Sequence, residues 1–291
     1  MADETTTGLS TDVGGRELTP GVAMLAATVA VISIVVGTLL AAGGLTGHVL
    51  GAWTSPEPLS SGLVGAAMLG VSPGLFAIGR ARVWEEARTL VCPLAVVILG
   101  LLAVSLLNAD KLQVAEGGAL LLVLFSLGWV AVLGVLAVCT VVCLFLQYLK
   151  PRLPLGDRVV PLPGWSKPLL AVLGSAWFGI GSGLLVIPRY WAGFVPWSVN
   201  RPDAQALGVW ALALGVGILG ALAEDDMSRV RPAMLALPGV AIAVSVVLGA
   251  RASEVGWTSG PGLSLIAMVG GLFAAGVMGR WYLSRLPMPQ Q

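Results

Sequence analysis

The stretch that decides the fold is WSVNRPDAQALGVWALALGVGILGALAEDDMSRVRPA, residues 197–233. A polar segment opens it, an apolar run extends to Ala223, and a cluster of acidic and basic residues, 224–231, closes it. A long apolar run between polar and charged ends is typical of a membrane-spanning helix with its connecting loops.

An earlier copy of this pattern begins at Trp53. A Pro-Glu-Pro segment follows, then an apolar run to Gly79, then the charged segment 80–88. Matching residues in and just upstream of the two copies are 144 positions apart: Trp53 and Trp197, Pro58 and Pro202, and Gly37 and Gly181. The spacing predicts two tandem units of four membrane helices. Because each unit has an even number of crossings, we expect parallel units related by an axis along the membrane normal.

Composition places the chain among integral membrane proteins. Hydrophobic residues make up 57% of it and charged residues 11%, and the mean hydropathy is +0.92. The charges are confined to short clusters between long apolar runs, whereas soluble proteins carry them along every surface helix. A net charge of +1 gives no reason to expect nucleic acid as a partner. The expected surroundings are a lipid bilayer, and no cofactor is expected.

Eight apolar runs are expected to be membrane helices, so the predicted fold is an all-α polytopic membrane helix bundle. The runs are residues 20–44, 61–79, 90–107, 119–149, 168–187, 206–223, 233–250 and 261–279. They form a first unit, 20–149, and a second unit, 168–283. Between them, prolines in the basic connector 150–167 prevent helix continuation. Residues 1–19 are expected to be a disordered cytoplasmic tail and residues 284–291 a second cytoplasmic tail.

The distribution of lysine and arginine predicts the orientation in the cell membrane. Of the 16 cations, 12 fall in the two tails and in the second, fourth and sixth connections, and four fall in the odd-numbered connections. The positive-inside rule places the more cationic side, and both termini with it, in the cytoplasm.

The central parts of the eight apolar runs contain no Asp, Glu, Lys, Arg or His. Ionisable residues inside the membrane are the usual mark of proton relays, ion coupling and charged-substrate sites. Their absence argues against a proton-coupled pump and against an ion channel with a charged ring. It also argues against an enzyme, since no general base lies at depth. Hydroxyls and backbone carbonyls at broken helices remain able to bind sodium or a neutral solute.

Two charged connections on the cytoplasmic side are candidates for a contact between the units. Under the 144-residue spacing, Arg80 corresponds to Glu224 and Arg82 to Asp226, so the signs are opposite. A rotation axis along the membrane normal puts these loops on the same face, where they can approach each other. The expected inner-loop charge clamp consists of Arg80, Arg82, Glu224, Asp225 and Asp226.

The acidic residues 224–226 have other interpretations. Arg229 and Arg231 follow at once and can neutralise the acids locally, and the acids can cap the following helix. Adjacent carboxylates on a short loop are also able to bind a divalent ion loosely. Interfacial ion pairs contribute only about 0–1 kcal/mol each unless they form a network.

A candidate outer rim consists of Trp53, Arg189, Tyr190, Trp191 and Trp197. Aromatic and proline residues around an arginine suit the rim of a ligand pocket or a partner surface. The other interpretation is an aromatic belt at the level of the lipid headgroups, which requires no ligand.

Residues that bind metals are sparse. His48 is the single histidine, and Cys92, Cys139 and Cys143 all lie within apolar runs. Cys139 and Cys143 share one helix face, but no further cysteine or histidine is near in sequence to complete a site. We therefore predict no metal site.

The second half resembles a pattern found in multi-pass bacterial membrane proteins that have no assigned activity. The residues that carry the resemblance are Trp197, Pro202, Leu207, Gly208, Trp210, residues 224–226, Arg229, Arg231, Pro232 and Ala233. The first copy lacks the acidic triplet and the Arg-Pro-Ala sequence. The resemblance therefore implies architecture alone.

These observations favour an accessory or assembly subunit of a membrane complex, which binds other membrane proteins and needs no polar residues at depth. The alternative is a transporter or binding protein for a lipid or apolar solute, with a site between the two units. Transport predicts a cavity between the halves lined by Ser, Thr and Gly. An accessory subunit predicts a filled core and an exposed apolar flank.

Reporter fusions test the orientation. We expect a reporter fused at Thr7 and a reporter fused at Gln291 both to give a cytoplasmic signal, because 12 of the 16 cations lie on that side. A fluorescent protein that matures in the cytoplasm and a phosphatase that is active outside it provide opposite readouts. An external signal from either terminus would contradict the predicted topology.

Overall fold

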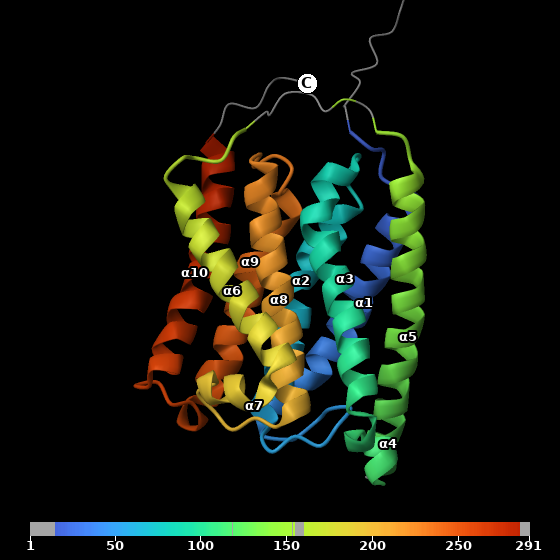
Figure 1. Cartoon of the computed structure of the whole chain (residues 1–291), viewed down its shortest axis with the longest axis vertical. Coiled ribbons are helices and arrows are strands. Elements are labelled where there is room, and N and C mark those ends of the chain that lie inside the picture. The colour runs from blue at the N-terminus through green and yellow to red at the C-terminus, as the bar shows by residue number, and fades with distance from the viewer. Residues whose placement is uncertain (1–14, 118, 153, 155–159, 286–291) are drawn as a thin grey trace, which may run out of the picture.

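The computed structural model describes residues 15–117, 119–152, 154 and 160–285 (Figure 1). In these residues the chain is an all-α bundle of eight long helices, joined by short helical turns. The first half contributes α1 (Pro20–Thr46), α2 (Pro58–Ile78), α3 (Trp84–Leu107) and α5 (Leu120–Leu149). The second half contributes α6 (Ser166–Val186), α8 (Arg201–Glu224), α9 (Arg231–Ala250) and α10 (Gly260–Arg285). The short elements are η1 (Ala109–Lys111), α4 (Gln113–Glu116), α7 (Pro188–Trp191), η2 (Ala192–Phe194) and η3 (Ala252–Glu254).

All eight long helices are long and apolar enough to cross a membrane. Even α9, with 20 residues, spans about 30 Å at 1.5 Å per residue, which is the thickness of the hydrocarbon core. The chain is therefore a multi-pass integral membrane protein. The start of α1 and the end of α10 lie at the same end of the bundle, and α4 and α7 lie at the other (Figure 1).

Several helices begin earlier than the apolar runs predict. The structure starts α2 at Pro58 rather than at residue 61, α3 at Trp84 rather than 90, and α8 at Arg201 rather than 206. Proline fits the first turn of a helix, and acidic side chains such as Glu85 are stabilised by the positive end of the helix dipole. Hydropathy alone misses these turns because they are polar.

The expected disordered tail is only partly within the described residues. Its last residues, 16–19, lie against the first half. The backbone N–H of Leu18 donates to the carbonyl of Arg82 at 3.0 Å, and that of Thr19 donates to the buried side chain of Gln147 at 2.8 Å. The end of the tail is therefore part of the folded unit, which corrects the expectation of disorder for these residues. Residues 1–14 and 286–291 and most of the middle of the connector lie outside the described residues.

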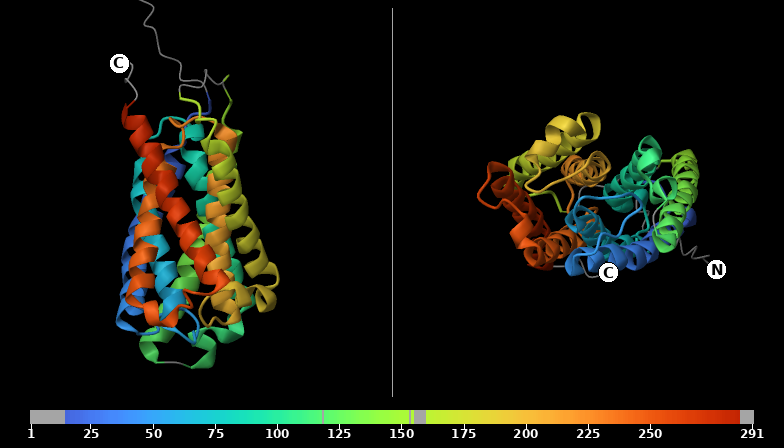
Figure 2. Two further views of the ribbon diagram at one scale, coloured as in Figure 1. Left: turned by 90° about the vertical axis from the view of Figure 1, so that its left-hand side faces the viewer. Right: turned by 90° about the horizontal axis from the view of Figure 1, so that it is seen from below.

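The helices pack in an order that treats the two halves alike. Within the halves, α1 packs along α2 as α6 packs along α8, and α3 contacts α5 as α9 contacts α10. Between the halves, α2 packs on α9 and α3 packs on α8. Seen along the helices, the two halves lie side by side (Figure 2). Exchanging the first four long helices for the second four leaves this list of pairs unchanged.

The boundaries of the elements follow the 144-residue spacing closely. Helix α2 begins at Pro58 and α8 at Arg201, 143 residues later, and the turns η1 and η3 begin at Ala109 and Ala252, also 143 residues apart. Exchange-symmetric packing and this spacing are both what a tandem repeat predicts. Superposition of the halves remains a prediction.

Glycines set the closest helix crossings. At Gly65 of α2, a Cβ atom would lie 2.5 Å from the backbone nitrogen of Ala41 in α1. At Gly208 of α8, a Cβ would lie 2.8 Å from the Cβ of Leu184 in α6. The contact between halves is as close, since a Cβ at Gly70 would lie 2.3 Å from the Cα of Val240 in α9. Small residues at crossings let membrane helices gain van der Waals contact where hydrophobic driving force is absent.

Substituting Gly65 tests the first crossing. Gly65→Ala should destabilise the protein by about 1–3 kcal/mol, because the added methyl group forces two backbones apart. Gly134→Ala in α5 is the control, since a Cβ there meets no atom within 4 Å and alanine favours the helix by up to about 1 kcal/mol. Thermal unfolding in detergent measures both. Equal stability of the two variants would show that the crossing is not tightly packed.

Candidate functional site

A buried carboxylate joins the two halves at the end of the bundle where α8 begins. The side chain of Asp203 is 2% exposed. Its Oδ1 accepts a hydrogen bond from the indole Nε1 of Trp53 and another from the hydroxyl of Ser55, both at 2.8 Å. Asn200 caps α8 by accepting from the backbone N–H of Asp203 at 2.9 Å, and its amide donates to the carbonyl of Thr54 at 2.6 Å. The start of α8 is thus held by the first connection of the other half.

The candidate outer rim separates into three parts. Trp53 is buried and belongs to the contact with Asp203 rather than to an exposed rim. Trp197 donates its indole N–H to the hydroxyl of Ser60 at 3.0 Å. Arg189, Tyr190 and Trp191 lie on α7, where Tyr190 and Trp191 pack against Phe194. The five residues do not form one ring, because the buried polar groups of the connections draw the two flanking tryptophans inward.

A second polar contact between the halves lies at the same end. Arg251 pairs with Glu254 at 3.1 Å, and both act electrostatically on Glu57 of the other half. Burial, followed by the nearby carboxylate of Glu254, raises the pKa of the Glu57 carboxyl above its ordinary value. The guanidinium of Arg251 and the backbone N–H of Ser198 offset part of this rise.

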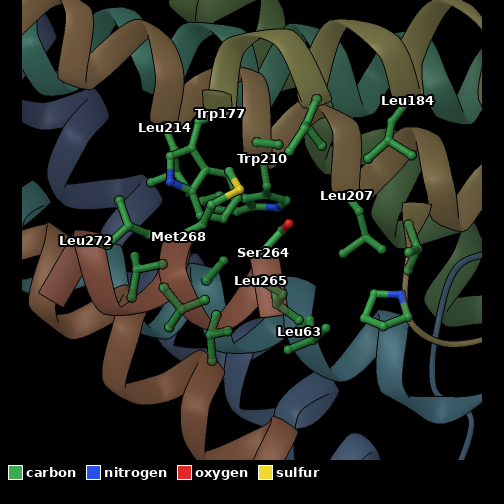
Figure 3. A pocket seen from close by; sticks show the side chains of 18 of the residues that line it. Leu63, Trp177, Leu184, Leu207, Trp210, Leu214, Ser264, Leu265, Met268 and Leu272 are labelled. Carbon is green, nitrogen blue, oxygen red and sulfur yellow. The ribbon is translucent and has the colours of Figure 1, made fainter. Parts of the chain in front are cut away.

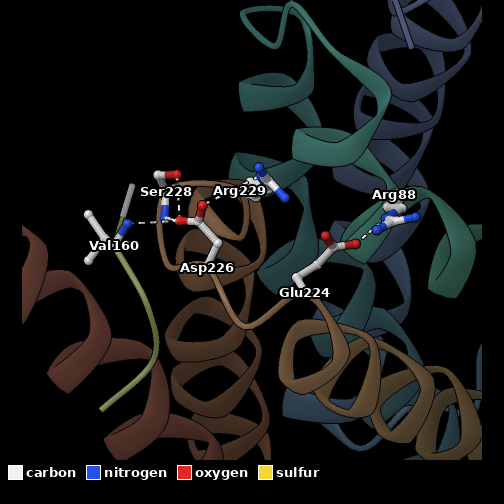
Figure 4. A network of polar contacts seen from close by, with 6 residues as sticks. All are labelled: Arg88, Val160, Glu224, Asp226, Ser228 and Arg229. Atoms are coloured by element: carbon white, nitrogen blue, oxygen red, sulfur yellow. Dashed lines mark hydrogen bonds and ion pairs between the residues drawn. The ribbon is translucent and has the colours of Figure 1, made fainter. Parts of the chain in front are cut away.

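At the opposite end, an ion pair joins α3 to α8. The guanidinium Nε of Arg88 donates to Oε1 of Glu224, the last residue of α8 (Figure 4). The side chain of Glu224 is 5% exposed and that of Arg88 34% exposed. Glu224 is therefore nearly removed from solvent, and Arg88 is its cationic partner.

The two arginines of the predicted clamp lie elsewhere. Arg80 and Arg82 are exposed in the connection before α3, and in the described residues neither forms an ion pair with Glu224, Asp225 or Asp226. The structure thus gives Glu224 a different arginine from the one that the 144-residue spacing suggested. The reason is geometric: α3 packs on α8, so an arginine one turn inside α3 reaches the end of α8, whereas the loop residues before it do not.

The other two acids of the triplet have partners in the second half and the connector. Lys167 binds Asp225 at 2.8 Å, and Arg229 binds the fully buried Asp226 at 3.5 Å. Asp226 also accepts from the backbone N–H and the hydroxyl of Ser228, at 2.9 and 2.6 Å (Figure 4). Arg229 thus neutralises Asp226 locally, as the alternative interpretation stated, while Glu224 binds across the halves.

A cavity of about 140 Å³, cavity 1, lies within the second half and is closed by α2 of the first (Figure 3). Its wall comes from α6, α8, α9 and α10 and from the segment 194–197. Almost all of the wall is apolar. The exceptions are the hydroxyl of Ser264 and the indole rings of Trp177, Trp197 and Trp210.

A larger cavity of about 420 Å³, cavity 2, occupies the corresponding place in the first half. It lies between α1, α2, α3 and α5, and its wall is apolar apart from Ser33 and the two indoles of Trp129 and Trp210. Val31 and Val35 of α1 line this cavity and are also exposed on the outside of the bundle. Cavity 2 therefore reaches the lipid-facing surface.

Trp210 lies where these spaces meet. It lines cavity 1 and cavity 2, and it also lines a third space of about 80 Å³ between α2, α3, α8 and α9, at the interface of the halves. The expected cavity between the halves thus exists only as this small space, whose polar or small lining residues are Thr89 and Gly217. The two larger cavities lie one in each half, and each borrows part of its wall from the other half.

The cysteines and the histidine are not gathered at any of these places. Cys92, Cys139 and Cys143 are free thiols. The ring Nδ1 of His48 lies 3.1 Å from the hydroxyl of Thr46, at the exposed end of α1.

Comparisons with protein-family models, with curated proteins and with solved structures find no match to this chain.

Neutral variants test the ion pair between the halves. Arg88→Met should destabilise the protein by about 1–3 kcal/mol, because it leaves the carboxylate of Glu224 nearly buried without a partner. Arg80→Met and Arg82→Met are matched controls on exposed arginines and should change the stability by less than about 0.5 kcal/mol. Unfolding in detergent gives the three values.

A double-mutant cycle separates the pair from its surroundings. The variant Arg88→Met with Glu224→Gln should be more stable than the sum of the single effects predicts, since neither partner is left charged and alone. Strict additivity, or equal effects at Arg80 and Arg88, would contradict the assignment of Arg88 as the partner.

Proposed function

We propose that this protein binds an apolar molecule dissolved in the membrane, in the cavities of its helix bundle. The observation that carries the proposal is cavity 2, an almost entirely apolar space of about 420 Å³ that reaches the lipid-facing surface beside α1. A molecule that moves in the bilayer can enter such a space sideways without crossing water. The proposed role is binding, or binding during transfer, without a chemical step.

The size and chemistry of the cavities support this proposal. Apolar cavities of about 150 Å³ in proteins stay dry and accept molecules such as benzene. Cavity 1 is of this size, and cavity 2 is large enough for a longer apolar segment. Because lipid tails are as apolar as the cavity wall, affinity has to come from fit and van der Waals contact rather than from the hydrophobic effect. This favours a molecule whose shape differs from that of an acyl chain.

The alternative function is that of an accessory or assembly subunit. It requires a face that binds another membrane protein. Large apolar side chains are exposed along α1, α5 and α6, and contact with the bilayer alone accounts for them. The cavities favour binding of an apolar molecule over the subunit role. In either role, the proposed setting is the cell membrane with both termini in the cytoplasm.

Filling cavity 2 tests the function. Gly128 of α5 lines this cavity, and a Cβ added there meets no atom within 4 Å. Gly128→Leu should therefore occupy the cavity without disturbing the packing. Gly134→Leu is the matched control, since Gly134 lies on the same helix with equally open space but lines none of the three cavities.

The probe is an aryl diazirine, a small photoreactive hydrocarbon, added to the full-length protein in bilayer discs. We expect saturable labelling of peptides that contain Phe125 and Trp129, which line cavity 2. Gly128→Leu should reduce this labelling at least about tenfold, whereas Gly134→Leu should leave it unchanged. Labelling that rises linearly with probe in every variant would show that the probe samples only the lipid-facing surface. That result would overturn the proposed function and favour the subunit role.

A further inference from the structure

The fold satisfies most of the indole N–H groups that it buries. Trp53 donates to Asp203, Trp129 donates to the hydroxyl of Ser105 at 3.1 Å, and Trp197 donates to that of Ser60 at 3.0 Å. Trp257 donates to the carbonyl of Ala252 at 2.7 Å. Tryptophan usually finds an acceptor when its N–H is buried, because an unpaired donor away from water is costly. Buried indoles without an acceptor are therefore exceptions that call for an explanation.

Two tryptophans are such exceptions, and both line cavity 1. The indole nitrogens of Trp177 and Trp210 are buried, and neither has a hydrogen-bond partner among the described residues. Trp210 is 8% exposed, and it lies nine residues, about 14 Å, along α8 from Arg201. Figure 3 shows both rings in the wall of the cavity, together with the side chain of Ser264. Two unpaired donors and one hydroxyl thus converge on a space that is otherwise apolar.

The inventory of polar groups selects the chemistry of a ligand. The wall of cavity 1 contains no charged residue, so an anion such as a carboxylate or a phosphate would be buried there without a cation, which is unfavourable. A hydrocarbon would leave both N–H groups unpaired. A carbonyl oxygen is neutral and has two lone pairs, so that it can accept from both indoles.

We propose that cavity 1 holds the carbonyl group of an apolar molecule, with the indole N–H groups of Trp210 and Trp177 as its hydrogen-bond donors. This inference rests on the proposed function and defines the ligand class for the second half of the molecule. Such a carbonyl has two sources, the ester of a bilayer lipid or the ketone of a separate molecule dissolved in the bilayer. The chemistry recognised is the same in both.

Nuclear magnetic resonance of the full-length protein with ¹⁵N-labelled tryptophan observes the donors directly. The probes are acetophenone, an aryl ketone, and isopropylbenzene, a hydrocarbon of nearly the same shape. In discs of ether-linked phospholipid, which has no carbonyl, acetophenone should move the indole resonances of Trp177 and Trp210 downfield, and isopropylbenzene should not. The ketone should bind about three to ten times more tightly than the hydrocarbon, the contribution expected of a hydrogen bond.

Discs of ester-linked phospholipid distinguish the two sources. If the lipid ester itself is the ligand, both resonances lie downfield before any probe is added. If they move only on addition of acetophenone, a separate ketone is the ligand. Either outcome supports the proposal. Indole resonances that are identical in both lipids and do not respond to acetophenone would overturn it.

Substitutions assign the effect to the donors. In Trp210→Phe with Trp177→Phe, the preference for the ketone over the hydrocarbon should fall to about one. Trp197→Phe is the matched control, because Trp197 also lines cavity 1 but its N–H already donates to Ser60. This variant should keep the preference.

The two probes together separate this inference from the proposed function. If neither probe binds saturably to the wild-type protein, the proposed function fails. If both bind with equal affinity and the indole resonances do not move, an apolar site exists but the recognition of a carbonyl is wrong.

Discussion

The structure depends on two buried carboxylates, one at each end of α8. Asp203 and Glu224 are nearly removed from solvent, and a buried carboxylate is stable only when donors or a cation surround it. In both cases groups of the first half satisfy the carboxylate, Trp53 and Ser55 at one end and Arg88 at the other. Helix α8 belongs by sequence to the second half but is fixed at both ends to the first. Its middle is left to line the cavities.

The cavities follow from this placement. Because α8 is held at its ends, Trp210 near its middle is positioned between the two halves rather than inside one of them. A residue of this size at the meeting point of three spaces separates them sterically. Each half therefore contains its own apolar space, and the same side chain forms part of both walls. The two spaces differ in volume because the helices around cavity 1 are drawn together by bulky aromatic residues from the segment 194–197.

The sequence predicted the helices well and the site only in part. Eight apolar runs became eight long helices, since length and hydropathy determine a membrane span almost alone. The charged ends were also identified, but their pairing was not, because the choice between Arg82 and Arg88 depends on how far α3 extends and how it packs on α8.

The residues of the cavities left less trace in the sequence. Asp203 follows Asn200 at the spacing of a helix cap, and the structure confirms that cap, but nothing in the pattern indicates that Trp53 donates to its carboxylate. Trp177 and Trp210 look like ordinary apolar residues of a span. Only the arrangement of neighbouring helices shows that their N–H groups lack acceptors.

The glycine contact at Gly70 has a mechanical consequence. There, α2 and α9 touch backbone to backbone along one side of the interface between the halves. On the other side, α3 and α8 enclose a small space and are joined by an ion pair at one end. Surfaces in close backbone contact resist separation but permit rotation about their common line, whereas the looser side can part. We therefore expect relative motion of the halves to resemble that of a book, with α2 and α9 as the spine and the edge between α3 and α8 as the opening.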